Sequence, residues 1–238
     1  MKQIILNHID VEIWNNLHVQ FQPHSDVNII MGSNGSGKTT FLRNLYLSLA
    51  EDKESKDHII YLPSIDNIAM RDKRKTATAL SQELDYYIYD MKTGPSLMSL
   101  RMSMLDSSEE KRIEMKAKIA DFQKVINDFF AITGKRIEIE GSKFSVLTDT
   151  GVLPVEALSS GEKQILLILL RVFLLNGNEA IVVIDEPTYS LDIEWQFKLA
   201  TTLTHLNNKA QYFIASLSPA LFGERWGDKV WYMDQITK

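Results

Sequence analysis

The spacing of apolar residues divides the chain into short strands and longer helices. Apolar or alternating runs predict strands at residues 3–7, 18–22, 26–31, 58–62, 136–140, 143–147, 180–184, 212–215 and 229–233. Apolar residues at helical spacing predict helices over residues 38–50, 76–90, 107–133, 161–175 and 193–206. Residues 180–184 are all apolar, which is typical of a central parallel strand covered on both faces. Strands alternating with helices predict an α/β sandwich.

Residues 76–133 differ from the rest because their pattern is helical throughout. The second helix of this region carries apolar residues that alternate steps of four and three over about two heptads: Met115, Ile119, Phe122, Ile126 and Phe129. Ser107 with Glu110 predicts a capping box at its start, and Gly134 is placed to end it. A packed helical hairpin is one interpretation of this pattern, and an extended coiled-coil arm is the other. We therefore expect a core of residues 1–75 and 134–238 that carries a short helical insertion, residues 76–133.

Composition limits the class of protein. The chain has 238 residues, 45% of them hydrophobic, which suffices for one large domain or a domain with a modest insertion. It has no cysteine, which excludes disulfides, cysteine-ligated zinc and thiol catalysis, and which fits a cytoplasmic protein. The longest apolar run, residues 165–175, is interrupted by Arg171 and is shorter than the roughly 20 residues that span a bilayer. We expect a soluble, cytoplasmic chain without a transmembrane segment.

The net charge of −5 gives no overall basic field for binding nucleic acid. The densest basic run consists of Arg71, Lys73, Arg74 and Lys75. It is either a solvated loop or a local patch for phosphates, so nucleic acid stays open as a partner.

A glycine-rich segment after the third predicted strand carries the clearest chemistry. Its eight residues fit the pattern G-x-x-x-x-G-K-[ST] in full: Gly32, Ser33, Asn34, Gly35, Ser36, Gly37, Lys38 and Thr39. Glycines let the backbone wrap around a polyphosphate, and the amides at the start of the next helix point at the anion. Lys38 can reach the β- and γ-phosphates, while Thr39 offers a hydroxyl to Mg²⁺. We expect this cradle, with the adjoining Thr40, to bind ATP and Mg²⁺.

Two carboxylates follow the apolar strand at residues 180–184. Asp185 stands at the strand's end, where it would hold Mg²⁺ directly or through water. Glu186 points differently and is suited to orient and polarise an attacking water molecule. Lys38 and Glu186 are therefore the candidate catalytic residues. An ordinary strand end could also carry two acids, so it is the glycine-rich cradle elsewhere in the chain that favours a catalytic role for this pair.

A third segment, residues 158–164, resembles the signature of ABC-type ATPases, usually written LSGGQ. Ser160 stands in place of the first glycine and Glu162 in place of the glutamine. Ser159, Gly161 and Glu162 begin a helix, where a serine and nearby amides can meet a γ-phosphate, although a plain helix cap would use the same residue types. The resemblance implies that one subunit's signature closes on ATP bound to the other. Residues 190–192 follow at the spacing of the family's D-loop.

The resemblance is closest to the RecF/SMC/OLD-like branch. Residues 186–196 are similar to a stretch of the small ATPases found in bacterial defence and retron operons, residues 61–64 resemble their Pro-Ser segment, and residues 26–32 resemble the entry to the cradle in RecF-like proteins. The resemblance implies an α/β ABC-ATPase (P-loop NTPase) sandwich with an antiparallel N-terminal β subdomain and a short helical insertion.

Several positions depart from the family pattern. Asp192 stands where this branch often has histidine, and Ser64 lies near the place of the transporters' glutamine. Leu217 takes the place of the switch histidine and has no side-chain group that can hydrogen-bond a γ-phosphate. This predicts slow hydrolysis, or a protein that uses ATP mainly to dimerise. Trp14 either stacks on adenine or packs the N-terminal sheet.

The function expected from these motifs is an ATP-driven homodimer that regulates a separate effector protein, in bacterial antiviral defence. A DNA-repair or chromosome-type ATPase that clamps DNA is the first alternative, and the ATPase subunit of a transporter is the second. The acidic balance weighs against the first, and Ser64 and Leu217 weigh against the second, whereas Asp192 favours it.

Overall fold

The structure is a computed structural model that describes residues 4–51, 58–74, 76–140, 143–223 and 225–238. The chain forms two compact units. The first joins Met1–Asn67 to Leu175–Lys238, and the second is Ile68–Leu174. The expected insertion, residues 76–133, lies within the second unit, which also contains the segment similar to the ABC signature.

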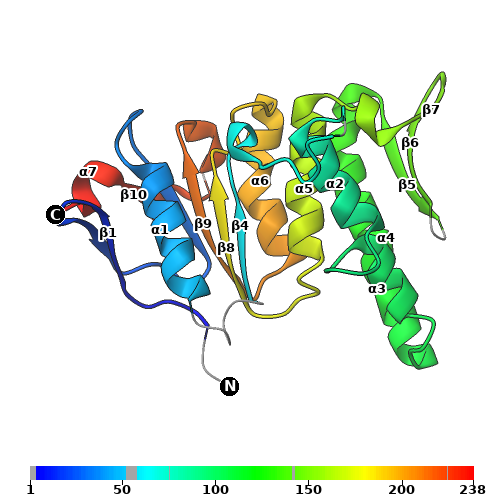
Figure 1. Ribbon diagram of the computed structural model, residues 1–238, viewed down its shortest axis with the longest axis horizontal. Coiled ribbons are helices and arrows are strands. Elements are labelled where there is room, and N and C mark those ends of the chain that lie inside the picture. Colours follow the sequence, from blue (N-terminus) through cyan, green and yellow to red (C-terminus); the bar gives the residue numbers. More distant parts are fainter. Residues whose placement is uncertain (1–3, 52–57, 75, 141–142, 224) are drawn as a thin grey trace. The chain divides into compact units, whose positions relative to one another are not determined.

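A five-stranded parallel sheet forms the centre of the first unit, in the order β10-β3-β9-β8-β4 (Figure 1). Its strands are β3 (Val27–Met31), β4 (Ile59–Leu62), β8 (Ala180–Asp185), β9 (Ala210–Ser216) and β10 (Val230–Tyr232). Every residue of β8 is buried, as its continuous apolar run predicts, and every residue of β3 and β9 is buried as well. Met31 pairs with Ser216 and Asp185 pairs with Ala215, so three strands end at one edge of the sheet.

One helix of the first unit is enclosed between the sheet and a hairpin. Helix α1 (Lys38–Ala50) contacts β4, β8 and β9 as well as the antiparallel hairpin of β1 (Ile9–Trp14) and β2 (Leu17–Phe21). The hairpin turns at Asn15 and Asn16, both in the left-handed region that asparagine tolerates. The shared core includes Val11 and Phe21 of the hairpin together with Phe41 of α1. Helices α6 (Ile193–Leu206) and α7 (Met233–Ile236) complete this unit.

The predicted strand at residues 3–7 is wrong in its described part, because residues 4–7 form no strand, and Gln3 lies outside the described residues. The buried side chain of Gln211 replaces the strand ladder there. Its Oε1 accepts the Leu6 N–H at 2.8 Å, and its Nε2 donates to the Leu6 carbonyl at 3.0 Å. The first strand instead begins at Ile9, where buried and exposed residues alternate.

The second unit combines helices with a three-stranded antiparallel sheet of β5 (Arg136–Glu140), β6 (Lys143–Thr148) and β7 (Gly151–Leu153). Its helices are α2 (Ala79–Tyr89), α3 (Leu97–Ser103), α4 (Glu109–Phe130) and α5 (Ser160–Phe173). The apolar seam of α4 packs inside the unit, where the rings of Phe122 and Phe173 stack with centroids 4.2 Å apart. The predicted cap at Ser107 is wrong by one residue, because Ser108 accepts the Lys111 N–H.

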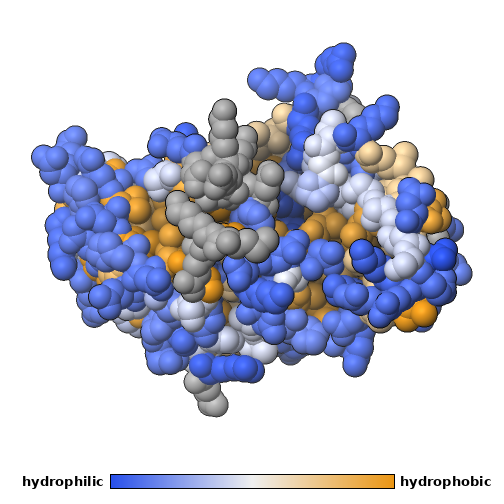
Figure 2. Space-filling view, turned by 90° about the horizontal axis from the view of Figure 1, so that it is seen from below, coloured by the Kyte–Doolittle hydropathy of each residue, from blue (hydrophilic) through white to orange (hydrophobic). Residues whose placement is uncertain are grey.

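Hydrophilic residues predominate on the face drawn in Figure 2, with hydrophobic residues in smaller patches between them. Among the helices of the described residues, none is long and apolar enough to cross a membrane.

Candidate nucleotide-binding site

The loop between β3 and α1 has the backbone that the glycine pattern predicts. Gly35 and Gly37 have φ of 77° and 93°, a region that other residues rarely adopt. A Cβ atom on Gly37 would also lie 3.1 Å from Ile13 Cδ1 and 3.3 Å from the Trp14 ring. A Cβ atom on Gly32 would lie 2.6 Å from Ser36 Oγ. The positive φ at Gly35 and Gly37, and the close side chains at Gly32 and Gly37, therefore favour glycine at these places.

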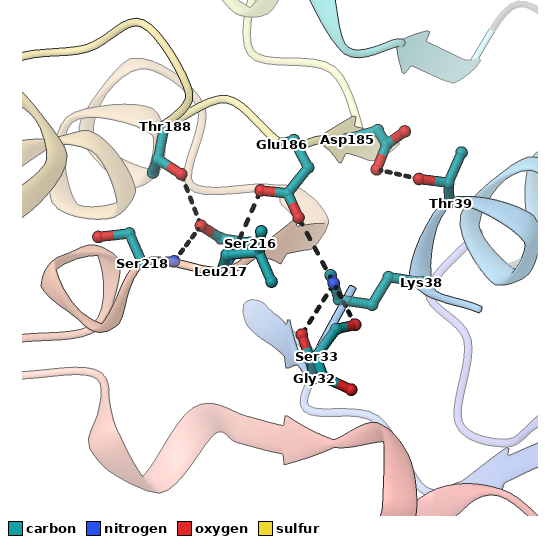
Figure 3. A network of polar contacts seen from close by, with 10 residues as sticks. All are labelled: Gly32, Ser33, Lys38, Thr39, Asp185, Glu186, Thr188, Ser216, Leu217 and Ser218. Atoms are coloured by element: carbon teal, nitrogen blue, oxygen red, sulfur yellow. Dashed lines mark hydrogen bonds and ion pairs between the residues drawn. The ribbon is translucent and has the colours of Figure 1, made fainter. Parts of the chain in front are cut away.

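The ammonium group of Lys38 lies inside the loop, and its residue is only 6% exposed. Its Nζ donates to the carbonyls of Gly32 at 2.8 Å and Ser33 at 3.2 Å, and it lies 3.6 Å from Glu186 Oε1 (Figure 3). A buried ammonium needs such partners because water does not reach it. The structure thus brings together the two residues predicted to be catalytic, although they are far apart in the sequence.

At the same site, Asp185 faces Thr39, whose hydroxyl lies in the first turn of α1 (Figure 3). Thr39 Oγ1 donates to Asp185 Oδ1 at 3.1 Å. Asp185 Oδ2 is buried and has no hydrogen-bond partner among the described residues. Burial raises the pKa of the Asp185 carboxyl, although Thr39 and Lys38 act in the opposite direction. An unpartnered carboxylate oxygen beside a hydroxyl is the oxygen donor set that Mg²⁺ prefers, so these two residues fit the predicted metal.

Glu186 adopts a backbone conformation that is rare for its type, with φ of 46°. Its N–H donates to the Ala215 carbonyl at 2.9 Å, and its Oε2 accepts the Leu217 N–H at 3.2 Å. Burial raises the pKa of the Glu186 carboxyl, and the nearby Lys38 charge opposes that rise. Strained backbone of this kind concentrates at functional sites, and here it occurs at the residue whose carboxylate lies 3.6 Å from Lys38 Nζ.

The segment after β9 is held by a hydroxyl network rather than by a histidine. Ser216 Oγ lies 2.7 Å from Thr188 Oγ1 and accepts the Ser218 N–H at 3.0 Å (Figure 3). The network fixes the backbone at Leu217, whose N–H meets Glu186 while its side chain is 45% exposed. At this position only the main chain makes a polar contact with the predicted catalytic acid.

A cavity of about 390 Å³ opens over the loop. The residues of the loop from Asn34 onward, including Thr40, form its floor together with Glu186 and Leu217. Trp14 and Ser64, both singled out in the sequence, also line it. Asp66 and Tyr189 line it as well, and neither is among the predicted site residues. No motif marks Asp66, which lies in the short 3-10 helix Ile65–Asn67, and Tyr189 lies within the stretch similar to the small defence ATPases without a role assigned to it. The cavity is therefore lined by the aromatic ring of Trp14, by the glycine-rich loop and by the acidic residues Asp66 and Glu186.

The predicted signature residues lie in the second unit, at the start of α5. Ser159 is the N-cap, and its Oγ accepts the Glu162 N–H at 3.2 Å while Glu162 Oε2 accepts the Ser159 N–H at 2.8 Å. Gly161 is buried in the first turn. The segment therefore forms a capping box, with the serine exposed at a helix N-terminus. This is the local geometry that suits an anion, and it also satisfies the requirements of a plain cap.

The family model described as the RecF/RecN/SMC N terminal domain matches residues 5–235, nearly the whole chain. The chain belongs to this family. The RecF/RecN/SMC assignment agrees with the cradle, the paired acids and the signature, and it identifies the protein as an ABC-type ATPase of the SMC/RecF type. The DNA replication and repair protein RecF of Nitrosococcus oceani is 44% identical over 43 residues. That match covers 18% of this chain and only 12% of the length of RecF.

Three solved structures share the fold. The Smc head bound to the C-winged helix domain of ScpA has a TM-score of 0.56 and 14% identity, over 91% of this chain and 90% of that one. A putative ABC transporter ATP-binding protein from Pyrococcus furiosus has a TM-score of 0.55 and 16% identity, over 98% of each chain. The SMC head domain from Thermotoga maritima has a TM-score of 0.53 and 12% identity, over 92% of this chain and 91% of that one. At these identities the likeness concerns the fold alone.

The basic run of the sequence is largely paired where it is described. Arg71 contacts Glu83 through two nitrogens and lies over the Tyr86 ring at 3.5 Å, and Arg74 contacts Asp72. Lys75 lies outside the described residues. These pairs leave less free positive charge in the run than its sequence suggests.

Proposed function

We propose that the chain binds and hydrolyses Mg-ATP, and that two ATP molecules sandwiched between two copies hold a homodimer together. One observation carries the proposal: Lys38, Thr39 and Glu186 line one cavity over a glycine loop shaped for a polyphosphate, and Thr39 bonds to Asp185 beside it. The family assignment supports the same reading, since this site is what an ABC-type ATPase requires.

The residues divide the work by their chemistry. Two loop carbonyls and Glu186 hold Lys38, and phosphate oxygens would take over as its partners when ATP binds. Thr39 and Asp185 would hold Mg²⁺, which supplies charge neutralisation between the phosphates. Glu186 would orient a water molecule and accept its proton, a task aided by a pKa raised through burial.

The Leu217 position bears on the rate of hydrolysis. Its backbone N–H holds the Glu186 carboxylate, but its side chain offers no donor to a γ-phosphate. We therefore propose that turnover is slow and that ATP acts chiefly as a ligand for association. The energy for closing the dimer would come from the higher affinity of ATP for the closed form.

The signature supplies the second half of each site in this proposal. Ser159 is exposed at the N-terminus of α5, where its hydroxyl and the helix amides can bind an anion. In the closed dimer, Ser159 of one copy would meet the γ-phosphate held by Lys38 of the other. The two copies would separate once hydrolysis removes that phosphate.

For the biological role, we propose that the dimer regulates a separate effector protein in bacterial antiviral defence. The similarity of residues 186–196 to the small defence ATPases supports this role. The local match to RecF favours a second candidate, an ATPase that clamps DNA. The net charge of −5 and the paired Arg71 and Arg74 weigh against broad phosphate binding by the described surface.

The test of the dimer uses Glu186→Gln and Lys38→Ala, two changes within the same cavity. Glu186→Gln keeps ATP but removes the acid that orients water, so we expect a stable dimer with Mg-ATP in size-exclusion chromatography with light scattering. Lys38→Ala loses the phosphate contact and should remain a monomer without bound nucleotide. A Glu186→Gln protein that stays monomeric with Mg-ATP would contradict the dimer, and one that binds no nucleotide would contradict the ATP site as well.

The test of the role uses the same pair as baits in the native host. An effector protein enriched on Glu186→Gln relative to Lys38→Ala is the expected result, identified by mass spectrometry. ATP-dependent binding of duplex DNA that weakens steeply with salt would instead favour the DNA-clamping candidate.

A further inference from the structure

Glu162 of the signature is a buried acid with two separate partners. The residue is 1% exposed. Its Oε2 accepts the Ser159 N–H at 2.8 Å, and its Oε1 lies 2.6 Å from Lys135 Nζ. Burial alone would raise the pKa of Glu162, but the bonds from Lys135, Ser159 and Thr133 outweigh it and lower the pKa. The carboxylate is therefore charged, and Lys135 supplies the countercharge.

Lys135 is anchored at the end of another helix. Helix α4 and the short turn after it end at Gly134, whose φ of 65° reverses the chain. The Lys135 N–H then donates to the Phe130 carbonyl at 3.2 Å, which ties its backbone to the last turn of α4. Its side chain is 21% exposed and reaches the first turn of α5. The ion pair thus links the C-terminal end of α4 to the N-terminus of the signature helix.

The capping box beside this ion pair sets which way the Ser159 hydroxyl can bond. Ser159 Oγ accepts the Glu162 N–H at 3.2 Å, so its own hydrogen is left to donate elsewhere. The Glu162 side chain, folded back onto the Ser159 N–H, makes the second bond of the capping box and fixes the Ser159 backbone. Lys135 keeps it there by neutralising the carboxylate in a place that water hardly reaches.

We propose that Lys135 is a positioning residue for Ser159: through its ion pair with Glu162 it holds the signature serine ready to donate to the γ-phosphate on a second copy of the chain. The proposal rests on the ATP-sandwich dimer described above. It also makes α4 a mechanical link, because a movement of its C-terminal end would move the Lys135 ammonium and loosen the capping box.

The experiment separates nucleotide binding from dimer closure in the Glu186→Gln background. Lys135→Met removes the countercharge, while the cradle lies in the other unit and is unchanged. We expect the affinity of the monomer for a fluorescent ATP analogue to stay within about twofold. The dimer dissociation constant with Mg-ATP, from analytical ultracentrifugation, should rise about tenfold or more, the effect of losing a charge-assisted hydrogen bond.

Two further variants identify the cause. Lys135→Met combined with Glu162→Gln leaves no buried charge, and the glutamine oxygen can still accept the Ser159 N–H, so dimerisation should recover. Lys118→Met is the matched control, because Lys118 pairs with Glu114 at 2.9 Å on the exposed face of α4. It should leave both measurements unchanged.

The outcomes distinguish the two levels of the account. A parent protein that stays monomeric with Mg-ATP overturns the sandwich dimer and this inference with it. A parent that dimerises while Lys135→Met dimerises equally well overturns this inference alone. Should Lys135→Met fail to fold, Lys135→Gln takes its place, because glutamine keeps a hydrogen-bond donor. We then expect a smaller rise in the dimer dissociation constant, and an unchanged constant overturns this inference alone.

Discussion

Asp185→Asn should stabilise the protein without ligand while removing its response to magnesium. Asp185 is 1% exposed, and within the described parts of the chain only one of its two oxygens has a partner, the Thr39 hydroxyl. A buried polar group without a partner costs about 1–3 kcal/mol, and a charged one costs more. Asparagine keeps the shape and the bond from Thr39. Its amide nitrogen takes the place of the unpartnered oxygen, so a polar group stays unpartnered, but the buried charge, which is the larger cost, is removed. We expect a gain of about 1–2 kcal/mol in the free energy of unfolding.

The gain should depend on pH in a defined direction. Burial places the folded pKa of Asp185 above its ordinary value of 3.8. The folded protein therefore binds more protons than the unfolded chain between those two pKa values, and wild-type stability falls as pH rises through that window. Below it the carboxyl is neutral in both states and the two proteins should differ little. Above it the full advantage of asparagine should appear.

Thermal unfolding followed by circular dichroism measures this prediction. For a chain of this size, the gain corresponds to a rise of roughly 2–8 °C in Tm at neutral pH. With Mg-ATP at about 100 times its Kd, the wild type should gain about 2.7 kcal/mol. Asp185→Asn should gain clearly less, and EDTA should reduce only the wild-type gain. A variant that is less stable without ligand, or that gains as much from Mg-ATP, would refute the reasoning.

Two other substitutions test the switch segment and the core. Leu217→His places a side-chain donor next to the backbone N–H that holds Glu186, so the rate of phosphate release should rise about tenfold or more. Leu217→Ala is the control and should not change the rate. Vigorous turnover by the wild type would contradict this prediction. Tyr212→Phe removes a buried hydroxyl 2.7 Å from the Leu203 carbonyl and 2.8 Å from that of Asn207, and should lower stability to urea by about 1–2 kcal/mol; an unchanged urea midpoint would count against it.

Helices and strands with clear start and stop signals were predictable from the sequence. Helix α1 (Lys38–Ala50), strand β5 (Arg136–Glu140) and helix α6 (Ile193–Leu206) have the predicted bounds. Each is marked by a clear apolar period and by residues that start or stop it. The α/β fold and the ABC-type family are confirmed for the same reason, since the motifs that carry them are local.

Short elements, and contacts between residues distant in sequence, were not predictable. Helix α3 (Leu97–Ser103) is short and is set by its capping box at Ser96, and β7 (Gly151–Leu153) is a mostly exposed strand of three residues. The Lys135–Glu162 pair joins residues 27 positions apart, which no local pattern encodes. The positive φ of Glu186 likewise follows from its tertiary bonds rather than from its residue type.

The sandwich of ATP between two copies can be measured directly because the chain has no cysteine. In the Glu186→Gln background, one protein carries Asn34→Cys at the exposed loop and the other carries Ser160→Cys beside the signature serine. A short bismaleimide added to the mixture should join the two proteins only with Mg-ATP, and Lys38→Ala in the loop-labelled protein should abolish the product. A product that forms equally without ATP, or no product with it, would contradict the account.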